Sequence, residues 1–418
     1  MNTTMRTNSS NKIASTFQWI IIILAACLVY GVMQGIHDNY GIMMRGLLID
    51  TGVDYASISF CIGVGALVYG FAQPFLGMLA LKKSNTFVQM IGILCTVTGL
   101  VVSPLCRSFI TLLFFFGLLL PFGTAGLCFG IIMGAISPIV GEERAAMFSG
   151  IIQASAGIGD ALMSPGLQGL IAAFGIRTAM SSFSIPFLIM IPIALWIGHL
   201  NRNLPWIAID SNQEHIPLSH IIRSAFRDRD YRLILIGFAT CGFNMSIIES
   251  HLFSQFISYG IPEQAASFAL TVYGIATMLG AAGIGFLSMK FPMKNLLGSV
   301  YGIRIFISLG FLLLPKSIPF AFIMTALLGM SGDSTVPPTS GIISKKFGSK
   351  NMAMLYGFVL VGHQIGAFAS AYLGGICVKN GWGYEPLWIM NLCLATIASI
   401  ASFSIRKESI HIESKTVR

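Results

Sequence analysis

The hexapeptide GMLALK at residues 77–82 recurs as GFLSMK at residues 285–290, an offset of 208 positions in a chain of 418 residues. Each copy follows a long apolar stretch. A second pair, MFSG at residues 147–150 and MLYG at residues 354–357, has an offset of 207 positions. Because both offsets lie close to half the chain length, we infer that the sequence consists of two related halves.

The composition excludes several classes of protein. Hydrophobic residues make up 55% of the chain, charged residues only 10%, and the mean hydropathy is +0.79, whereas a globular domain carries about 25% charged residues. A soluble enzyme and a disordered chain are therefore excluded. The net charge of +9 comes from basic residues too sparse to follow a phosphate backbone, so a nucleic-acid binder is also excluded. Eight cysteines without a CxxC pair indicate neither a disulfide framework nor a metal site, and no cofactor is expected.

Twelve stretches are long and apolar enough for membrane helices, each of which needs about 20 residues. Their continuous apolar runs differ from the alternating pattern of a membrane barrel. We therefore predict an all-α polytopic membrane protein with twelve transmembrane helices in two pseudo-symmetric six-helix bundles. The spans are expected near residues 17–40, 55–80, 86–105, 109–137, 145–173, 179–199, 231–257, 264–289, 294–314, 318–342, 352–377 and 384–404.

Polar segments divide the chain into five parts. We expect an N-terminal tail at residues 1–16, a six-helix bundle at 17–200, a linker at 201–230, a second bundle at 231–405 and a C-terminal tail at 406–418. Parallel halves of this kind place a substrate between them near the middle of the membrane.

The lysines and arginines predict the orientation. Nineteen of the 25 fall in the two tails, the linker and alternate loops, whereas five fall in the remaining loops and Arg304 lies inside a span. The positive-inside rule therefore predicts cytoplasmic termini, in a cell inner (plasma) membrane. The LAAC at residues 24–27 resembles a lipoprotein cleavage box, but the apolar run continues beyond it, so we interpret it as part of an uncleaved first span. A monomer in the lipid bilayer is expected.

The two hexapeptides resemble the loop motif of the major facilitator superfamily, usually written G-x-x-x-D-[RK]-x-G-[RK]-[RK]. Four further stretches resemble its bacterial monocarboxylate-transporter-like and oxalate/formate antiporter branch. They are residues 134–159, residues 241–243 with 251–252, residues 335–341, and residues 358–375. The resemblance covers the chain from Phe17 to Arg406 and implies a transporter with this fold.

The sequence departs from that branch at charged positions. The aspartate of the loop motif is replaced by Leu81 in the first half and by Met289 in the second. The substrate-binding arginine of span eight aligns with Ala281. The arginine of span one aligns with His37, and the lysine of span eleven with His363. The cationic residues are thus relocated within the spans.

Ionisable residues inside spans are candidates for function because insertion of each costs about 2.5–3.5 kcal/mol. At about 1.5 Å per residue, Arg304, His363 and Asp160 lie near the midplane, and Glu249 lies in the outer half of span seven. His37 is expected in the outer third of span one. The candidates for substrate contact are Arg304, His363, His37 and Asn244. The candidates for proton coupling are Asp160, Asp333, Glu249 and His363.

Structural roles remain open for several of these residues. Arg304 could pair with a carboxylate, His363 could be a packed histidine, and Asp160 and Asp333 could form ion pairs between helices. His37 with Asp38 could form a hydrated rim. A gating role is expected for loop residues at the cytoplasmic ends of the spans, namely Gly77, Lys82, Gly285, Lys290 and Arg144.

The energy source is expected to be a gradient or exchange. No G-x-x-x-x-G-K-[ST] loop occurs, and the longest polar segment is too short for a nucleotide-binding domain. The first hypothesis is a symporter that couples protons to a small organic solute of the carboxylate type. The alternatives are a carrier of a drug-like compound or of a larger metabolite such as a siderophore, and a non-transporting membrane sensor. No catalytic motif such as H-E-x-x-H or G-x-S-x-G occurs, so no enzyme activity is expected.

Overall fold

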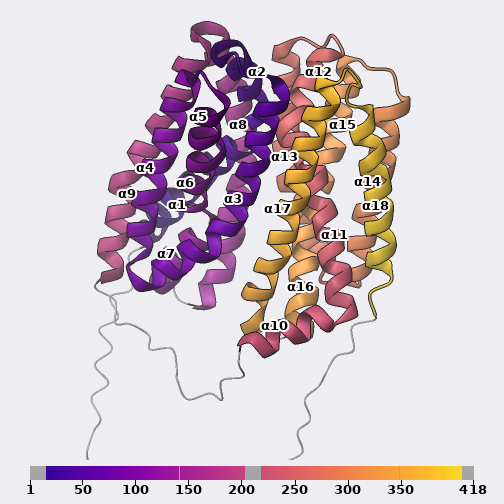
Figure 1. Ribbon diagram of the computed structural model, residues 1–418. Coiled ribbons are helices and arrows are strands. Elements are labelled where there is room, and N and C mark those ends of the chain that lie inside the picture. Colours follow the sequence, from indigo (N-terminus) through magenta and orange to yellow (C-terminus); the bar gives the residue numbers. More distant parts are fainter. Residues whose placement is uncertain (1–15, 141, 203–217, 348, 407–418) are drawn as a thin grey trace, which may run out of the picture.

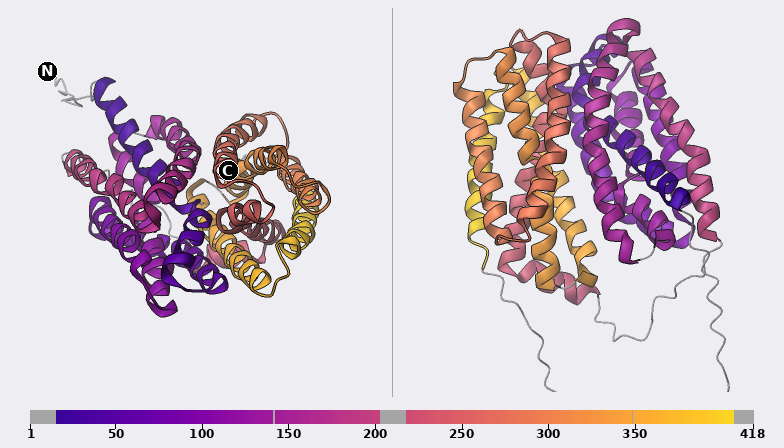
Figure 2. Two further views of the ribbon diagram at one scale, coloured as in Figure 1. Left: turned by 90° about the horizontal axis from the view of Figure 1, so that it is seen from above. Right: turned by 180° about the vertical axis from the view of Figure 1, so that it is seen from behind.

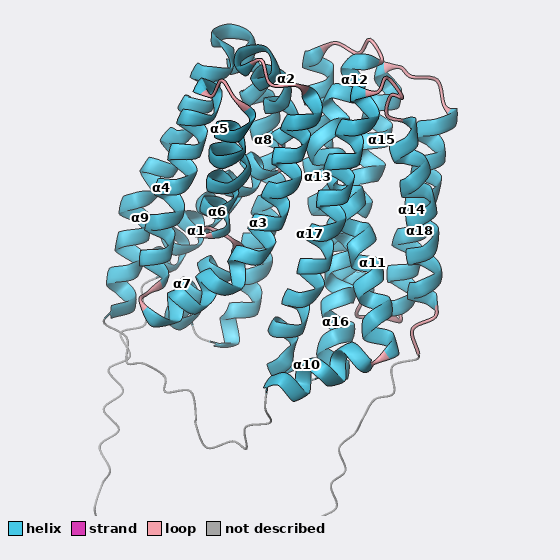
Figure 3. Ribbon diagram, viewed as in Figure 1, coloured by secondary structure: helices cyan, strands magenta, loops and turns pink. Residues whose placement is uncertain are grey.

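The computed structural model describes residues 16–140, 142–202, 218–347 and 349–406. These residues are helical apart from short turns, and they form two bundles that stand side by side (Figures 1 and 3). We call residues 16–202 the N-half and residues 218–406 the C-half. The predicted tails fall almost entirely outside the described residues, as do residues 203–217 of the predicted linker.

The elements of the N-half are α1 (Thr16–His37), α2 (Tyr40–Thr51), α3 (Tyr55–Lys82), α4 (Asn85–Val102), η1 (Ser103–Leu105), α5 (Phe109–Leu112), η2 (Leu113–Leu119), α6 (Leu120–Ala125), α7 (Phe129–Val140), α8 (Glu142–Ser182) and α9 (Ser184–Arg202). Those of the C-half are α10 (Leu218–Arg227), α11 (Arg229–Ser246), η3 (Ile247–Leu252), α12 (Phe253–Ser258), α13 (Glu263–Leu287), α14 (Met293–Leu313), α15 (Ile318–Ser331), η4 (Asp333–Thr335), α16 (Val336–Phe347), α17 (Ser349–Lys379) and α18 (Glu385–Phe403). Helix α10 thus lies inside the predicted linker.

The two ends of the molecule are distinct. The chain leaves the N-half at the end of α9 and enters the C-half at α10, and we call this end the linker side (Figure 1). Helices α2 and α12 lie at the opposite end, which we call the far side. Seen along the bundle axes, the halves are two separate rings of helices (Figure 2).

The predicted all-helical fold is confirmed, and eleven of the twelve predicted spans correspond to described segments that are long and apolar enough to cross a membrane. Ten described segments are long and apolar enough to cross a membrane, and one of these, Ile151–His199, is 49 residues long. Gly175 interrupts α8 with a φ of 78°, a conformation that favours glycine, so this segment comprises spans five and six. Span ten consists of α15 and α16, which are separated at Gly332 and are each too short to cross alone.

The first span differs from its predicted form. It was expected to end near residue 40, but after a break at Asp38 and Asn39 the chain continues as α2, most of whose residues are buried. Asn39 stabilises the break, because its side-chain amide donates to the carbonyl of Gly35 (2.7 Å) and its oxygen accepts from Ser164 (2.6 Å). His37 therefore ends α1 at a helix break, and with 8% of its surface exposed it is buried instead of forming a hydrated rim.

Side-chain oxygens cap the N-terminal ends of several helices, on the far side as well as on the linker side. Asp54 accepts from the backbone N–H of Ala56 at the start of α3, and Asp228 accepts from that of Tyr231 (2.9 Å) at the start of α11. Ser84 performs the same function for α4. Such caps satisfy N–H groups that have no partner within the helix.

Small residues allow the helices of each half to approach closely, and the two halves do this at equivalent positions. Gly31 and Gly35 of α1 pack against the backbone of α8 near Ser155 and Gly159. In the C-half, Gly242 of α11 packs against the backbone of α17 at His363. Spans one and five thus pair as spans seven and eleven do, which agrees with the repeat in the sequence.

Candidate functional site

The predicted ionisable residues converge where the two halves meet. Asp38 and Asp160 come from the N-half, and electrostatic interactions link them to Glu249 and Asp333 of the C-half. We call this group the central cluster. Its members are His37, Asp38, Asp160, Asn244, Glu249, Arg304, Asp333 and His363.

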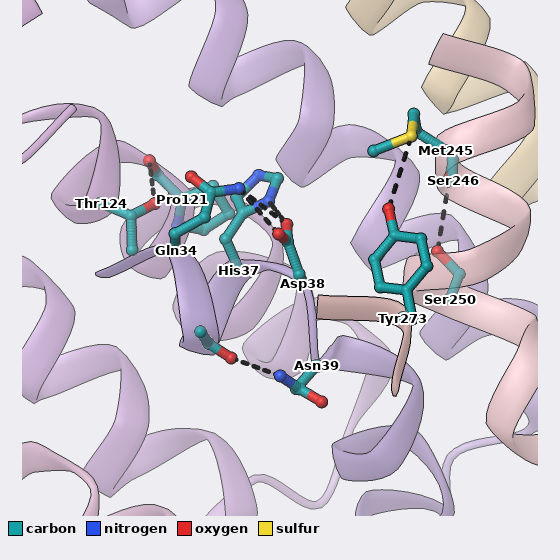
Figure 4. Close-up of polar contacts among 11 residues, drawn as sticks. Gln34, His37, Asp38, Asn39, Pro121, Thr124, Met245, Ser246, Ser250 and Tyr273 are labelled. Atoms are coloured by element: carbon teal, nitrogen blue, oxygen red, sulfur yellow. Dashed lines mark hydrogen bonds and ion pairs between the residues drawn. The ribbon is translucent and has the colours of Figure 1, made fainter. Parts of the chain in front are cut away.

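The N-half contributes an ordered imidazole and carboxylate at the break in span one. Nδ1 of His37 lies 3.1 Å from Oδ1 of Asp38, and Nε2 of Gln34 donates to both oxygens of Asp38 at 2.8 and 2.9 Å (Figure 4). The ring of His37 packs against Tyr40 and Tyr69, with centroids 5.5 and 4.6 Å apart. These contacts fix the orientation of both side chains.

Asp160 lies beside this pair, near the middle of span five as predicted. It is 4% exposed, its Oδ1 has no hydrogen-bond partner, and its carboxyl interacts electrostatically with that of Asp38. Neighbouring carboxylates repel each other unless one of them is protonated or a cation lies nearby. Asp160 is therefore a buried acceptor that requires such a partner.

Glu249 reaches the cluster from the C-half through an irregular helix. It lies in the π-helical segment η3, a form of helix that occurs often at functional sites. The carbonyl of Glu249 lies against Gly41 of α2, so the two halves touch here. His251 does not pair with Glu249. Its nitrogens instead meet the hydroxyl of Tyr55 and the carbonyl of Ala371, each at 3.0 Å.

The C-half contributes Arg304, which is 1% exposed. Its Nη2 donates to the carbonyls of Ser331 (2.6 Å) and Gly332 (2.9 Å), where α15 ends. A cation stabilises the C-terminal end of a helix, so Arg304 holds the break in span ten in place. Its Nε and Nη1 are buried and have no hydrogen-bond partner.

Three other polar groups of the C-half belong to the cluster. Asp333 begins η4 just after the break, and electrostatic interactions link it with Arg304 and His363. Nδ1 of His363 is buried without a hydrogen-bond partner, as are both amide atoms of Asn244, which is 1% exposed. The cluster thus presents unpaired donors in the C-half and carboxylates on both sides of the interface.

The far side is held by polar contacts between the halves. Arg45 of α2 forms an ion pair with Glu263 (3.2 Å), which also accepts from Gln168 of α8 (2.7 Å). The hydroxyl of Tyr55 meets both His251 (3.0 Å) and the hydroxyl of Tyr384 (3.2 Å). We call these six residues the far-side latch.

A further pair lies at the edge of the latch. Lys379 approaches Asp54 to 3.7 Å. The hydroxyl of Ser57 donates to Asp54 and, with backbone N–H groups and Lys379, lowers the pKa of this carboxyl below its usual value, although burial acts against the shift.

The predicted gating residues lie on the linker side, apart from the other half. A methyl group at Gly77 or Gly285 would meet no atom within 4 Å. Among the side chains that the structure describes there, Lys82 and Lys290 are exposed and form no hydrogen bond or ion pair. Arg144 lies in α8, and its side chain is outside the described part of the chain. The contacts between α3 and α17 that begin at the far side extend to Gly70 and Gln364.

Sequence reasoning missed part of this arrangement. Gln34 and the latch residues Tyr55 and Tyr384 were not singled out, because polar residues of these types occur commonly at span ends. Gln34 is four positions before Asp38, and this spacing places the two on one helix face. No comparable local signal connects Tyr55 with His251, because they are 196 positions apart.

Comparisons with known proteins agree with this architecture. A model of the Major Facilitator Superfamily matches residues 22–316 and 254–416. The uncharacterized MFS-type transporter YcxA of Bacillus subtilis (strain 168) is 20% identical over 401 residues, which cover 91% of this chain and 92% of that protein. Monocarboxylate transporter 11 of Mus musculus is 23% identical over 367 residues, which cover 85% and 80% of the two chains.

A solved structure shows the same fold. The crystal structure of a D-xylose-proton symporter superposes with a TM-score of 0.72 at 13% identity, covering 93% of this chain and 98% of the symporter. The family model spans most of the sequence, and the two six-helix halves are those of the superposed transporter. The chain is a member of the Major Facilitator Superfamily.

Proposed function

We propose that this protein is a secondary active transporter that moves a small organic solute of the carboxylate type together with protons, by alternating access. The single observation that carries the proposal is the division of the central cluster into unpaired donors and closely spaced carboxylates. Names of similar proteins support it, because one is a monocarboxylate transporter and another a D-xylose-proton symporter.

The donors suit an anion. Arg304 retains two buried N–H groups without partners, and Nδ1 of His363 and the amide of Asn244 are also unpaired. A guanidinium group presents donors in a fork that matches a carboxylate. An anion bound here would satisfy groups whose burial without a partner costs about 1–3 kcal/mol each.

The carboxylates suit proton coupling. Asp38, Asp160, Glu249 and Asp333 interact electrostatically with one another, and the permanent cation near them, Arg304, already holds two backbone carbonyls. Ionisable groups in this setting typically form proton pathways. Protonation of a carboxylate and arrival of an anion would then keep the total charge of the cluster nearly constant.

The conformation fits one end of an alternating-access cycle. The far-side latch joins the halves, whereas Gly77 and Gly285 on the linker side face open space. The basic residues support a cytoplasmic linker side in a plasma membrane, with both termini on that side, so this state opens inward. Closure of the linker side would bring Lys82, Lys290 and Arg144 toward the opposite half, which is the gating role proposed for them.

The test is uptake by purified monomeric protein in proteoliposomes with an imposed pH gradient. We expect accumulation of a member of a radiolabelled monocarboxylate panel when the outside is acid, and acidification of the lumen reported by an enclosed dye. Asp160→Asn should uncouple uptake from the gradient, and His363→Ala should weaken affinity. Glu385→Gln, a carboxylate change at the exposed start of α18, is the control. Uptake that ignores the gradient would remove the coupling, and absence of any flux would favour a sensor.

A cationic drug-like solute is the second candidate, favoured by the excess of carboxylates over permanent cations in the cluster. The same liposomes can be loaded with a lipophilic amine in place of the monocarboxylates. Amine exchange for protons, without carboxylate flux, would select this candidate. If the solute is a larger metabolite such as a siderophore, that metabolite should drive counterflow. Neither the monocarboxylates nor the amine should then do so.

A further inference from the structure

Three side chains of the central cluster are arranged as ligands for a metal ion. His37 and Asp38 come from the break in span one, and Glu249 comes from η3 in the opposite half. One donor atom from each lies within 4.8 Å of the other two. The imidazole nitrogen and the nearer oxygen of Asp38 are already 3.1 Å apart, which is close to the separation of neighbouring ligands around a small cation.

The surroundings hold these ligands as in established metal sites. Gln34 donates to both oxygens of Asp38 (Figure 4). The aromatic rings of Tyr40 and Tyr69 pack against the imidazole of His37. Outer partners of this kind orient the ligands of metal sites and raise their affinity. His37 and Asp38 would therefore need little reorganisation on binding.

Asp160 provides an independent indication of a missing partner. It is 96% buried, since its exposed fraction is 4%, and its Oδ1 has no hydrogen bond. Its carboxyl interacts electrostatically with those of Asp38 and Glu249, which are two of the three clustered ligands. Three carboxylates therefore face a single imidazole, and a divalent cation would both neutralise most of this charge and occupy the orphaned oxygen.

We propose that His37, Asp38 and Glu249, with Asp160 as a fourth ligand, bind a divalent first-row transition metal ion such as Zn²⁺. Mixed imidazole and carboxylate donors suit this class of metal. Bonds of about 2.0–2.2 Å to nitrogen and oxygen require the Glu249 carboxylate to swing inward from its present distance. Water can complete the coordination shell if Asp160 remains outside it.

The site links metal binding to conformation. Its ligands come from both halves, and they are held together where Gly41 of α2 touches the backbone of Glu249. Opening of the far side would separate His37 from Glu249 and dismantle the site. A bound metal ion therefore stabilises the latched state and slows the transport cycle, whichever solute is carried and whether or not protons are coupled to it.

The first experiment measures Zn²⁺ binding to the full-length protein in detergent after treatment with a chelator, by equilibrium dialysis. We expect about one equivalent, with affinity reduced about 10- to 100-fold or more in Glu249→Gln and in Asp38→Asn, since even outer partners contribute that much. Glu385→Gln and His220→Gln are the matched controls outside the cluster and should bind as the wild type does. Unchanged affinity in both cluster variants would overturn the proposal.

A second measurement uses the wild type alone, so it does not depend on how well a variant folds. X-ray absorption of the zinc-loaded protein should show only nitrogen and oxygen ligands at about 2.0–2.2 Å. A sulfur shell at about 2.3 Å would place the ion on one of the eight cysteines and overturn the proposal. Zinc should also slow hydrogen exchange in α2 and η3. Unaltered exchange there would refute the claim that the bound ion stabilises the latched state.

Discussion

The far side and the linker side are held together by different kinds of contact. On the far side, Arg45 with Glu263 and Tyr55 with His251 join residues of opposite halves. On the linker side, the salt bridges of Lys346 to Asp228 and Asp230 connect α16 with the start of α11 inside the C-half. The first kind of contact selects one relative position of the halves, whereas the second kind leaves that position free.

This difference indicates how the molecule moves. Contacts inside a half keep it rigid while it tilts, and contacts between halves are made and broken once in each cycle. Loss of a far-side contact is therefore expected to change the relative position of the halves, and loss of an internal contact to change the stability of one half. Four predictions test this contrast.

The largest effect is expected for Arg304→Met, which removes an internal contact. The carbonyls of Ser331 and Gly332 would both lose their buried donor, at about 1–3 kcal/mol each. Span ten would no longer be held at its break, and the C-half would lose rigidity. Thermal unfolding of the solute-free protein in detergent should show a large decrease in stability.

The control for this change is Arg304→Lys, which keeps the charge but can reach the two carbonyls with a single ammonium group. We expect an intermediate loss of stability. If the methionine variant unfolds at the wild-type temperature, Arg304 does not stabilise the break in span ten. Its remaining role is then to offer its unpaired nitrogens to a bound anion.

A smaller effect is expected for Tyr55→Phe in the latch. The change leaves Nδ1 of His251, a residue with no exposed surface, without its partner. A loss of about 1–3 kcal/mol corresponds to a shift of about 5- to 150-fold toward the state with an open far side. Spin labels at exposed positions Ile49 and Leu314, in a cysteine-free background, should report a larger fraction of long distances.

Tyr259→Phe is the matched control for the tyrosine change. Its hydroxyl accepts from Gln255 at 2.6 Å on the same side of the molecule, but both residues belong to the C-half. The distribution of distances between the labels should therefore be the same as in the wild type. Equal shifts in both variants would mean that loss of any buried hydroxyl loosens the far side.

The sequence was sufficient to predict the architecture, because each span carries its own apolar signal. It also selected most members of the central cluster, since an ionisable residue inside a span is conspicuous by itself. It did not predict the continuation of span one as α2. The break there depends on Asn39 bonding to Ser164 of another helix, and such a tertiary contact has no local pattern.

The same reason limits how far the surroundings of a residue can be predicted from its position in a span. Counting residues from the start of a span assumes a straight helix that crosses the membrane steeply. The break at Asp38 leaves His37 buried at the end of α1 and the neighbouring Asp38 in electrostatic interaction with Asp160. The π-helical segment η3 likewise changes the direction of Glu249, although no proline or glycine marks it.

The ion pair of Arg45 with Glu263 should contribute less than the tyrosine. Its side chains are 40% and 47% exposed, and exposed pairs contribute about 0.2–1 kcal/mol. A double-mutant cycle with Arg45→Gln and Glu263→Gln, read from the same spin-label distances, should give a coupling in this range that shrinks as salt is added. Arg177→Gln breaks a pair with Asp50 inside the N-half and should leave the distances unchanged. A salt-independent coupling would contradict a screened surface pair.

The smallest effect is expected for Asp228→Asn on the linker side. Burial opposes ionisation of Asp228, but hydrogen bonds from Lys346 and the N–H of Tyr231 outweigh it, so the pKa of this carboxyl is lowered. For Lys346, hydrogen bonds to Asp228 and Asp230 outweigh burial and raise its pKa.

The sign of the pH dependence follows from these shifts. A lowered carboxyl pKa stabilises the fold above the usual aspartate pKa of about 3.9, and this contribution is lost as the pH falls through the lowered value. The raised pKa of Lys346 stabilises the fold at lower pH and is lost only as the pH rises through that raised value. Wild type should therefore exceed Asp228→Asn in unfolding temperature near neutral pH, by an amount equivalent to about 1 kcal/mol or less, and the difference should vanish in acid. Because both partners lie inside the C-half, the far-side distances should not change at any pH, and a change there would show that the internal contacts do not leave the position of the halves free.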